Sequence, residues 1–386
     1  MGDNYTEYEH TGFLGNMGNS FGSMVFGFIL FIASFVLLWW NEGRAVDRYI
    51  TLETGQKNLV QTQKFDPKND GKLVYISGKM ESKAAPVDTQ FNIKNDKAVK
   101  IFRRVEMYQW KESERTKTEK NLGGSKTKRT TYSYDKVWSD SHINSNSFNS
   151  KYRDGHKNPS TKEPSKNYFA KNVKVKGYKL SDSQINMLEN LKDMSVPGDV
   201  KFPAKMASKA KNNSSFIYVS RSGNTSISNP AVGDYKISFR YLPAGSVSVI
   251  GEQQDGGFTE YKTKTGDLLE VRDGKLKSGE IFKKATSENE TFTWILRGVG
   301  LLVMTFGLAM CASPLQAFMN IIPILGSAVG AITGFFALII SLALSSITVA
   351  IAWMAHRPML SIAVAGGGIA IWLLLRMTQK SKTQRA

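Results

Sequence analysis

Residues 298–355 read GVGLLVMTFGLAMCASPLQAFMNIIPILGSAVGAITGFFALIISLALSSITVAIAWMA and contain no Lys, Arg, Asp or Glu. The hydrocarbon core of a bilayer is about 30 Å thick, and about 20 apolar residues in a helix cross it. A run of 58 uncharged residues is far longer than the buried helices of soluble proteins. The stretch therefore indicates a multi-pass integral membrane protein.

Helix breakers divide the C-terminal third of the chain. Pro314 and Pro323 bracket a short apolar connector, and residues 355–358 form a polar turn. The sequence predicts membrane helices over residues 292–312, 325–354 and 359–375, with the connector at 313–324 and a basic tail at 376–386. The uncharged run could instead hold three crossings, which would place the C-terminus on the other side of the membrane.

A further apolar segment, residues 24–40, follows an acidic N-terminus. A cleaved signal peptide is the competing interpretation, but such peptides have a basic start and small residues at the cleavage site. Here Trp39 and Trp40 end the segment. We therefore expect a retained transmembrane helix over 24–40, preceded by a cytoplasmic segment, residues 1–23.

The charge is concentrated between the apolar regions. The chain carries +18 in total, of which residues 1–40 contribute −3 and residues 292–386 contribute +6, so residues 41–291 carry +15. Basic residues that flank a membrane helix mark its cytoplasmic end, and the tail 376–386 is basic. With four crossings, both termini are predicted to be cytoplasmic and residues 41–291 extracytoplasmic. A basic domain attracts anionic lipid headgroups, although it can also be simply a solvated surface; nucleic acid is not expected outside the cytoplasm.

Residues 41–291 read as a β-rich α+β domain. Alternating apolar and polar residues predict strands over 72–80, 99–110, 132–138, 235–241 and 247–251. Ser181 and Gln184 form a capping box at the start of a helix, and Thr265-Gly266-Asp267 signals a hairpin turn. The charged segments 113–130 and 151–167 are expected to be loops. LVYISGKM and VSVIGEQQ share a pattern of a strand before a glycine, which suggests small barrel-like units.

Small residues recur at helical spacing in the apolar segments. Gly326, Gly330 and Gly334 line one face of the third helix, and Ala363 and Gly367 line one face of the fourth. Such faces let helix backbones approach closely. They predict packing within the bundle, or a homo-oligomer formed through the same glycines.

The sequence carries no signature of catalysis. It has one cysteine, Cys311, and four histidines without the spacing of a metal site. His142 and His156 with Asp140 and Asp154 specify no coordination. We therefore expect no catalytic, cofactor or metal site, and no enzyme activity.

Several strings resemble the LUMA family, also called the transmembrane protein 43 family. They are Asn41–Ala45 (NEGRA), Arg104–Trp110 (RVEMYQW), Tyr132–Tyr134 with Trp138, Ile143–Ser145 with Phe148, Gly155–Pro159 (GHKNP), Val232–Asp234, Thr265–Asp267, Trp294 with Arg297, and Arg357-Pro358. The resemblance implies four membrane spans, both ends in the cytoplasm and one large lumenal domain. Animal members of the family lie in the endoplasmic reticulum and inner nuclear membrane and associate with emerin and lamins, but the variable segments of this chain depart from the animal pattern, so the lamina role is not carried over. In a eukaryote the resemblance implies those two membranes, and in bacteria it implies the inner membrane.

These observations lead to one functional hypothesis and one alternative. The hypothesis is a non-enzymatic membrane scaffold that binds anionic lipid headgroups or other membrane proteins. The alternative is a lipid-remodelling or channel-like activity. The candidate membrane-proximal or interaction surface consists of Glu42, Gly43, Arg44, Arg48, Arg104, Glu106, Tyr108, Trp110, His156, Lys157 and Asn158. Glu42 and Arg44 are expected to pair with the base of the domain.

Overall fold

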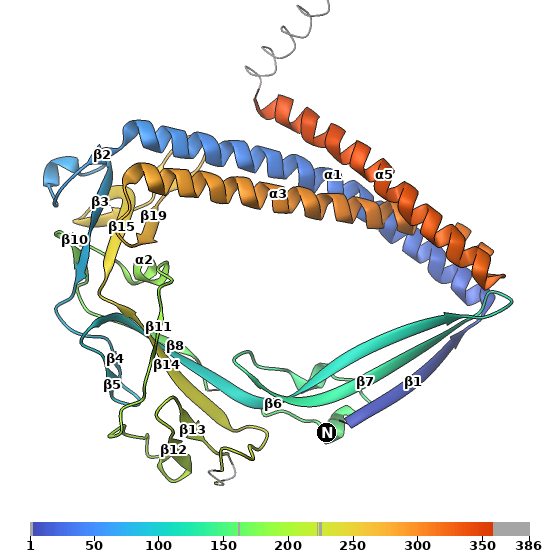
Figure 1. Cartoon of the computed structure of the whole chain (residues 1–386), viewed down its shortest axis with the longest axis horizontal. Coiled ribbons are helices and arrows are strands. Elements are labelled where there is room, and N and C mark those ends of the chain that lie inside the picture. Colours follow the sequence, from blue (N-terminus) through green and yellow to red (C-terminus); the bar gives the residue numbers. More distant parts are fainter. Residues whose placement is uncertain (1–2, 161–162, 222, 224–225, 358–386) are drawn as a thin grey trace, which may run out of the picture. The chain divides into compact units, whose positions relative to one another are not determined.

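The computed structural model describes residues 3–160, 163–221, 223 and 226–357. The chain divides into two compact units (Figure 1). The first contains residues 1–9, 54–117 and 128–283, and the second contains residues 10–53, 118–127 and 284–386. The expected fourth helix over 359–375, with Ala363 and Gly367, and the tail over 376–386 lie outside the described residues.

The first unit is built on an eight-stranded sheet of order β1-β7-β6-β14-β13-β12, in which β11 also pairs with β14 and β8 with β6. In β6, Ile101, Arg103 and Val105 are buried, whereas the residues between them are partly exposed. Because buried and partly exposed residues alternate along these strands, the central strands were predictable from the sequence. The bounds are β1 (Asp3–Thr11), β6 (Ala98–Lys120), β7 (Lys126–Ser139), β8 (Lys166–Phe169), β11 (Lys192–Met194), β12 (Ala210–Asn212), β13 (Ile217–Val219) and β14 (Tyr235–Pro243).

The expectation of a loop over residues 113–130 is wrong. These residues form the outer part of the β6–β7 hairpin, where Thr116 Oγ1 and Thr130 Oγ1 lie 3.3 Å apart. Gly123 and Gly124 supply the turn with φ of +81° and +79°, a conformation that glycine adopts without strain. The high charge of the segment concealed this Gly-Gly hairpin signal. The described residues of the segment 151–167 are largely loop, as expected, with a short 3-10 turn over Arg153–Gly155.

The N-terminal strand β1 lies beside β7 at the edge of the same sheet. Lys151 Nζ lies 2.8 Å from Glu7 Oε1, which fastens β1 further within this unit. Lipid offers no hydrogen-bond partners for the backbone groups at the exposed edge of an open sheet. The strands of such a sheet are therefore expected to lie on one side of a bilayer. Within this unit β1 is therefore part of the same sheet as β7, and the expected cytoplasmic location of residues 1–23 stays a prediction.

A second, seven-stranded sheet has the order β10-β9-β3-β15-β16, with β2 on β3 and β19 on β15. The two passages with the shared glycine pattern are β3 and β15, and they pair with each other. Gly78 lies opposite Val247, and Gly251 lies opposite Val74. A barrel-like unit stays a prediction: β10 and β16 are at the ends of the described sheet order, and a single backbone bond, from Lys179 N to Gly256 O at 2.8 Å, is described between these segments. The bounds are β2 (Val60–Gln61), β3 (Leu73–Glu81), β9 (Lys174–Val175), β10 (Tyr178–Lys179), β15 (Ser246–Gln254), β16 (Gly257–Thr259) and β19 (Glu270–Asp273).

Two apolar cores stabilise this unit. One surrounds β3 and β15 and includes Tyr178, and the other surrounds β6 and β14 and includes Phe91 and Phe239. The capping box at Ser181 is confirmed, and the turn at 265–267 joins two short strands. The remaining elements are β4 (Val87–Asp88), β5 (Ile93–Lys94), β17 (Tyr261–Lys262), β18 (Asp267–Leu268) and α2 (Asp182–Asn186).

The second unit is dominated by helices. Among the described residues, three helices are long and apolar enough to cross a membrane: α1 (Phe13–Asn58), α3 (Ser278–Cys311) and α5 (Pro323–His356). The expected connector at 313–324 holds a short helix, α4 (Ser313–Met319). Each of the three helices is longer than the span expected for it (24–40, 292–312 and 325–354). Hydropathy detects only the apolar part of a helix, and the helix continues through flanking polar residues where no proline interrupts it. Figure 1 shows α1 and α3 side by side.

Candidate functional site

Close packing of α1 against α3 begins at three glycines. A Cβ added to Gly307 would lie 2.7 Å from the backbone nitrogen of Phe31, and one added to Gly27 would lie 2.7 Å from Gly307 O. A Cβ on Gly300 would lie 2.8 Å from Leu38 Cγ. At Gly27 and Gly307 the nearest atoms include backbone atoms of the other helix, so only glycine fits there and the helix backbones approach closely.

Beyond this crossing, α1 and α3 are joined by buried polar side chains. Asn41 Nδ2 donates to Thr293 O at 3.1 Å, and Arg44 Nη2 donates to Thr293 Oγ1 at 2.9 Å. Arg44 Nη1 donates to Asn289 Oδ1 at 2.9 Å, and Asn289 Nδ2 returns a bond to Ala45 O. Arg44 therefore pairs with α3 rather than with the base of the domain.

Glu42 and Arg297 form the ionic centre of this network. Arg297 Nε and Nη2 donate to the two carboxylate oxygens of Glu42 at 2.7 and 2.8 Å. The Glu42 side chain is 3% exposed and that of Arg297 is 24% exposed. The guanidinium also lies 4.6 Å from the ring centroid of Trp294. Such a two-bond pair fixes direction as well as distance between helices.

Helix α5 meets α1 at Gly43. A Cβ on Gly43 would lie 2.8 Å from His356 Cε1, and the His356 ring lies 5.7 Å from that of Trp39. His356 Nε2 is buried and has no hydrogen-bond partner among the described residues. The absence of a side chain at Gly43 thus admits the imidazole. We call the set Asn41, Glu42, Gly43, Arg44, Asn289, Thr293, Arg297 and His356 the helix junction.

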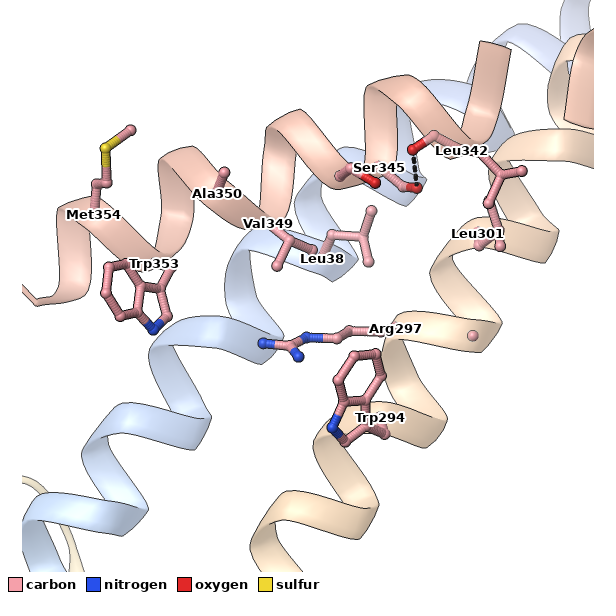
Figure 2. Close-up of a pocket in the computed structure, with 12 residues that line it drawn as sticks. Leu38, Trp294, Arg297, Leu301, Leu342, Ser345, Val349, Ala350, Trp353 and Met354 are labelled. Atoms are coloured by element: carbon pink, nitrogen blue, oxygen red, sulfur yellow. Dashed lines mark hydrogen bonds between the residues drawn. The ribbon is translucent and has the colours of Figure 1, made fainter. Parts of the chain in front are cut away.

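A cavity of about 770 Å³ adjoins the helix junction between α1, α3 and α5 (Figure 2). Figure 2 shows Arg297 reaching from α3 towards α1, with Trp294 and Trp353 at the same end. Leu301 and Leu342 lie at the other end. The walls are mostly apolar: Leu38, Trp294, Arg297, Gly298, Leu301, Leu342, Ser345, Ser346, Val349, Ala350, Trp353 and Met354.

The tip of the β6–β7 hairpin contacts other parts of the second unit. Asn16 Nδ2 donates to Gly124 O at 2.7 Å, and Gly123 N donates to Ile321 O at 3.0 Å. The side chain of Phe13 covers Gly124. These bonds hold the start of α1 and the end of the connector against the hairpin tip.

Two strings of the predicted surface meet within the first unit. Asn158 Oδ1 accepts from Trp110 N at 2.7 Å, and Asn158 Nδ2 donates to Trp110 O at 2.9 Å. The ring of Trp110 lies 4.7 Å from that of His156. Asn158 therefore acts as a strand partner for β6, which is a structural role.

His156 is buried in an aromatic cluster. Its ring stacks on Tyr134 at 3.9 Å, and Nδ1 lies 2.7 Å from Tyr152 O while Nε2 lies 3.1 Å from Asp3 Oδ2. Tyr134 donates a short hydrogen bond to Glu112. Burial, together with this bond, raises the pKa of Tyr134. The cluster attaches β1 to β7.

The other predicted surface residues are not members of the helix junction. Arg104 Nη2 lies 3.0 Å from Asp140 Oδ2 and 3.5 Å from Glu106 Oε1, and Lys157 Nζ lies 2.9 Å from Asp154 Oδ1. The remaining members, Tyr108 and Arg48, lie on β6 and α1; Tyr108 contacts Trp138 at 5.0 Å between ring centroids. Among the described residues no group of three or more His, Cys, Asp or Glu could hold a metal.

The glycines predicted to pack α5 have unequal surroundings. Gly326 contacts Asn320, and a Cβ on Gly330 would lie 3.6 Å from Gln316 Oε1. No described atom lies within 4 Å of a Cβ added at Gly334. In the described part of the chain, Gly326 and Gly330 face the connector, whereas Gly27, Gly300 and Gly307 join helices.

Comparison with known proteins identifies the family. The family model described as transmembrane protein 43 matches residues 107–358. The chain belongs to the transmembrane protein 43 family. Human transmembrane protein 43 is 30% identical over 386 residues, covering 96% of this chain and 94% of the human protein. The mouse protein is 31% identical over 372 residues (92% and 89%), and the Drosophila melanogaster homolog is 28% identical over 370 residues (90% and 93%). No solved structure matches the chain.

In this member of the transmembrane protein 43 family, the string Asn41–Ala45 has a clear structural role, since it supplies the α1 side of the helix junction. Sequence reasoning missed Asn289 and Thr293, which read as ordinary polar residues of a helix. Their spacing of four residues from each other, and of four from Thr293 to Arg297, places all three on one face of α3 and was the available signal.

Proposed function

We propose that this membrane protein is a non-enzymatic scaffold that holds its β-rich domain at a membrane and organises lipids or other membrane proteins there. The observation that supports the proposal best is the Glu42–Arg297 pair with the surrounding hydrogen bonds of Arg44. A scaffold needs fixed helix geometry, and a buried bidentate pair supplies it. The α1 helix also continues without a break from its apolar segment to Asn58.

The partners follow from the charge of the domain. The +15 carried by residues 41–291 favours an anionic membrane surface, at about 1 kcal/mol per basic residue near the surface. We propose Arg48 and the exposed lysines of the domain as the headgroup contacts. We propose that the basic tail 376–386 is cytoplasmic and that the domain at 41–291 lies on the other side. The compartment proposed is the endoplasmic reticulum or inner nuclear membrane in a eukaryote and the inner membrane in a bacterium.

Flotation with vesicles and cross-linking in native membranes test the scaffold. The full chain should co-float with phosphatidylglycerol vesicles in preference to phosphatidylcholine vesicles, and Arg48→Glu should weaken that preference. Cross-linking followed by mass spectrometry should recover the same set of membrane proteins in repeated preparations. Equal flotation with both lipids, together with no reproducible cross-linked protein, would remove the proposal.

A lipid-remodelling or channel-like activity is the second candidate function, and the apolar cavity beside Arg297 favours it. Reconstituted vesicles separate the two functions. A scaffold gives no lipid scrambling and no ion flux above that of empty vesicles, whereas the second function gives rates that rise with the amount of protein.

A further inference from the structure

The cavity beside the helix junction has the chemistry of a lipid site. At about 770 Å³ it lies within the range of small-molecule sites, about 300–1,000 Å³. Leu38, Leu301 and Val349 come from three different helices and give it apolar walls. Because these helices are the candidate membrane spans, the surrounding solvent is lipid rather than water. An acyl chain is the ligand that such walls accept.

One end of the cavity is polar. Arg297 uses Nε and Nη2 for Glu42, and its Nη1 has no hydrogen-bond partner among the described residues. Trp294 and Trp353 lie at this end (Figure 2), and tryptophan is enriched where membrane helices meet the headgroup region. A headgroup oxygen placed at Nη1 would complete the bonding of the guanidinium.

The charge of the helix junction selects the headgroup. Its three ionised side chains, Glu42, Arg44 and Arg297, carry one negative and two positive charges. The hydrogen bonds of Arg44 go to Asn41, Asn289 and Thr293, which are neutral. Arg297 is partly exposed and lines the polar end of the cavity, where its guanidinium requires an anionic partner at Nη1. A phosphate that carries a net negative charge meets this requirement, and a zwitterionic headgroup meets it less well.

We propose that the cavity binds one anionic phospholipid, with an acyl chain between α1, α3 and α5 and the phosphate at Arg297 Nη1. The inference deepens the proposed scaffold function, because it assigns a bound lipid to the helix junction that fixes the helices. It does not require a protein partner. Its failure and the failure of the scaffold proposal can therefore be told apart.

Native mass spectrometry of the purified full chain tests the site. Phosphatidylglycerol and phosphatidylcholine are added in turn, and the number of retained lipids and their affinities are measured. The unmodified chain should retain one phosphatidylglycerol, with about tenfold weaker retention of phosphatidylcholine. Ala350→Trp, which fills the cavity, should abolish retention of both. Ile332→Trp, on an exposed part of the same helix, should leave both unchanged.

A second variant tests the headgroup contact separately. Replacing Arg297 alone would leave Glu42 buried and unpaired, so the neutral double variant Glu42→Gln with Arg297→Gln is used. It should still bind lipid but lose the preference for phosphatidylglycerol. Retention of lipid in Ala350→Trp, or an unchanged preference in the double variant, overturns the proposal. A third outcome also overturns the proposal. In a Cys311→Ser background, one cysteine replaces Val349 and a second is placed within residues 359–375. A disulfide between the two would mean that the chain itself fills the cavity.

Discussion

Arg297 of α3 donates two hydrogen bonds, at 2.7 and 2.8 Å, to the carboxylate of Glu42 in α1. These residues are 255 positions apart in the sequence, and each comes from a helix that is long and apolar enough to cross a membrane. A buried carboxylate is tolerated only when it is paired. The pair therefore specifies one alignment of α1 with α3, and the other members of the helix junction follow from that alignment.

The glycine crossing of α1 and α3 should be intolerant of a single methyl group. Gly307→Ala places a Cβ 2.7 Å from the backbone nitrogen of Phe31, which cannot move aside as a side chain can. We expect a loss of about 1–3 kcal/mol in the free energy of unfolding, as for other overpacked cores. Thermal unfolding in detergent measures it.

Gly298→Ala is the matched control, because nothing lies within 4 Å of an added Cβ there. Alanine favours helix by about 1 kcal/mol over glycine, so this variant should be as stable as the parent or more stable. Equal effects at the two positions would contradict close packing at Gly307.

A buried ion pair in the first unit should be costly to break. Arg103 Nη1 lies 3.2 Å from Asp88 Oδ2, and the two side chains are 2% and 0% exposed. Arg103→Met leaves Asp88 buried without its cation, which should destabilise the β-rich domain by about 3–5 kcal/mol. Arg104→Met, on the exposed face of the same strand, should cost below about 1 kcal/mol. Chemical unfolding followed by tryptophan fluorescence compares them, and similar losses would argue against the described burial of Arg103.

Alkaline pH should destabilise the β-rich domain. Tyr218 is fully buried and donates to Asp234 Oδ2 at 2.5 Å; burial, followed by this bond, raises the pKa of Tyr218 above its ordinary value of 10. Burial likewise raises the pKa of Tyr168 to about 12. A tyrosine whose pKa is higher in the folded state stabilises fully below the unfolded pKa and loses this contribution as the pH rises towards the folded pKa.

The free energy of unfolding should therefore be flat near pH 8–9 and fall above about pH 10. Tyr218→Phe should be less stable at neutral pH and should show a shallower fall. Denaturant titrations at several pH values test this, and an unchanged slope in the variant would exclude Tyr218 as a source.

The N-terminal strand should lie on the same side of the membrane as the domain. Single cysteines replace Tyr8, Leu122 and Thr265 in a Cys311→Ser background, and sealed vesicles are treated with an impermeant maleimide. Pairing of β1 with β7, and the bond from Asn16 to Gly124, predict that all three label from one side, in which case α1 begins and ends on that side and does not cross the bilayer. Labelling of Tyr8→Cys from the opposite side to Thr265→Cys would instead support a cytoplasmic N-terminus.

Local pattern decided which features were predictable. Strands β3 and β14 and the capped helix α2 followed from alternation and a capping box, because each depends on residues close in sequence. The hairpin extension of β6 was not predicted, since its charged residues carry no apolar face. The pairing of β1 with β7 was not predicted either, because it joins segments more than 100 residues apart.

The sequence indicated only the α1 side of the helix junction. The string at Asn41–Ala45 stood out just after an apolar segment, but its partners were assigned to the base of the domain. Asn289 and Thr293 can be recognised as hydrogen-bond partners of Arg44 and Asn41 only when α3 is placed against α1. No local pattern in either helix specifies that alignment.

A double-mutant cycle on Glu42 and Arg297 tests the helix junction most directly. Glu42→Gln and Arg297→Gln are measured singly and together by unfolding in detergent, and the exposed pair Lys262–Asp267, 2.6 Å apart, serves as control. Each single change should cost about 3–5 kcal/mol, and the double variant should fall short of the sum by about 1–3 kcal/mol. Strictly additive losses, no larger than those of the control pair, would contradict a buried ionic link between α1 and α3.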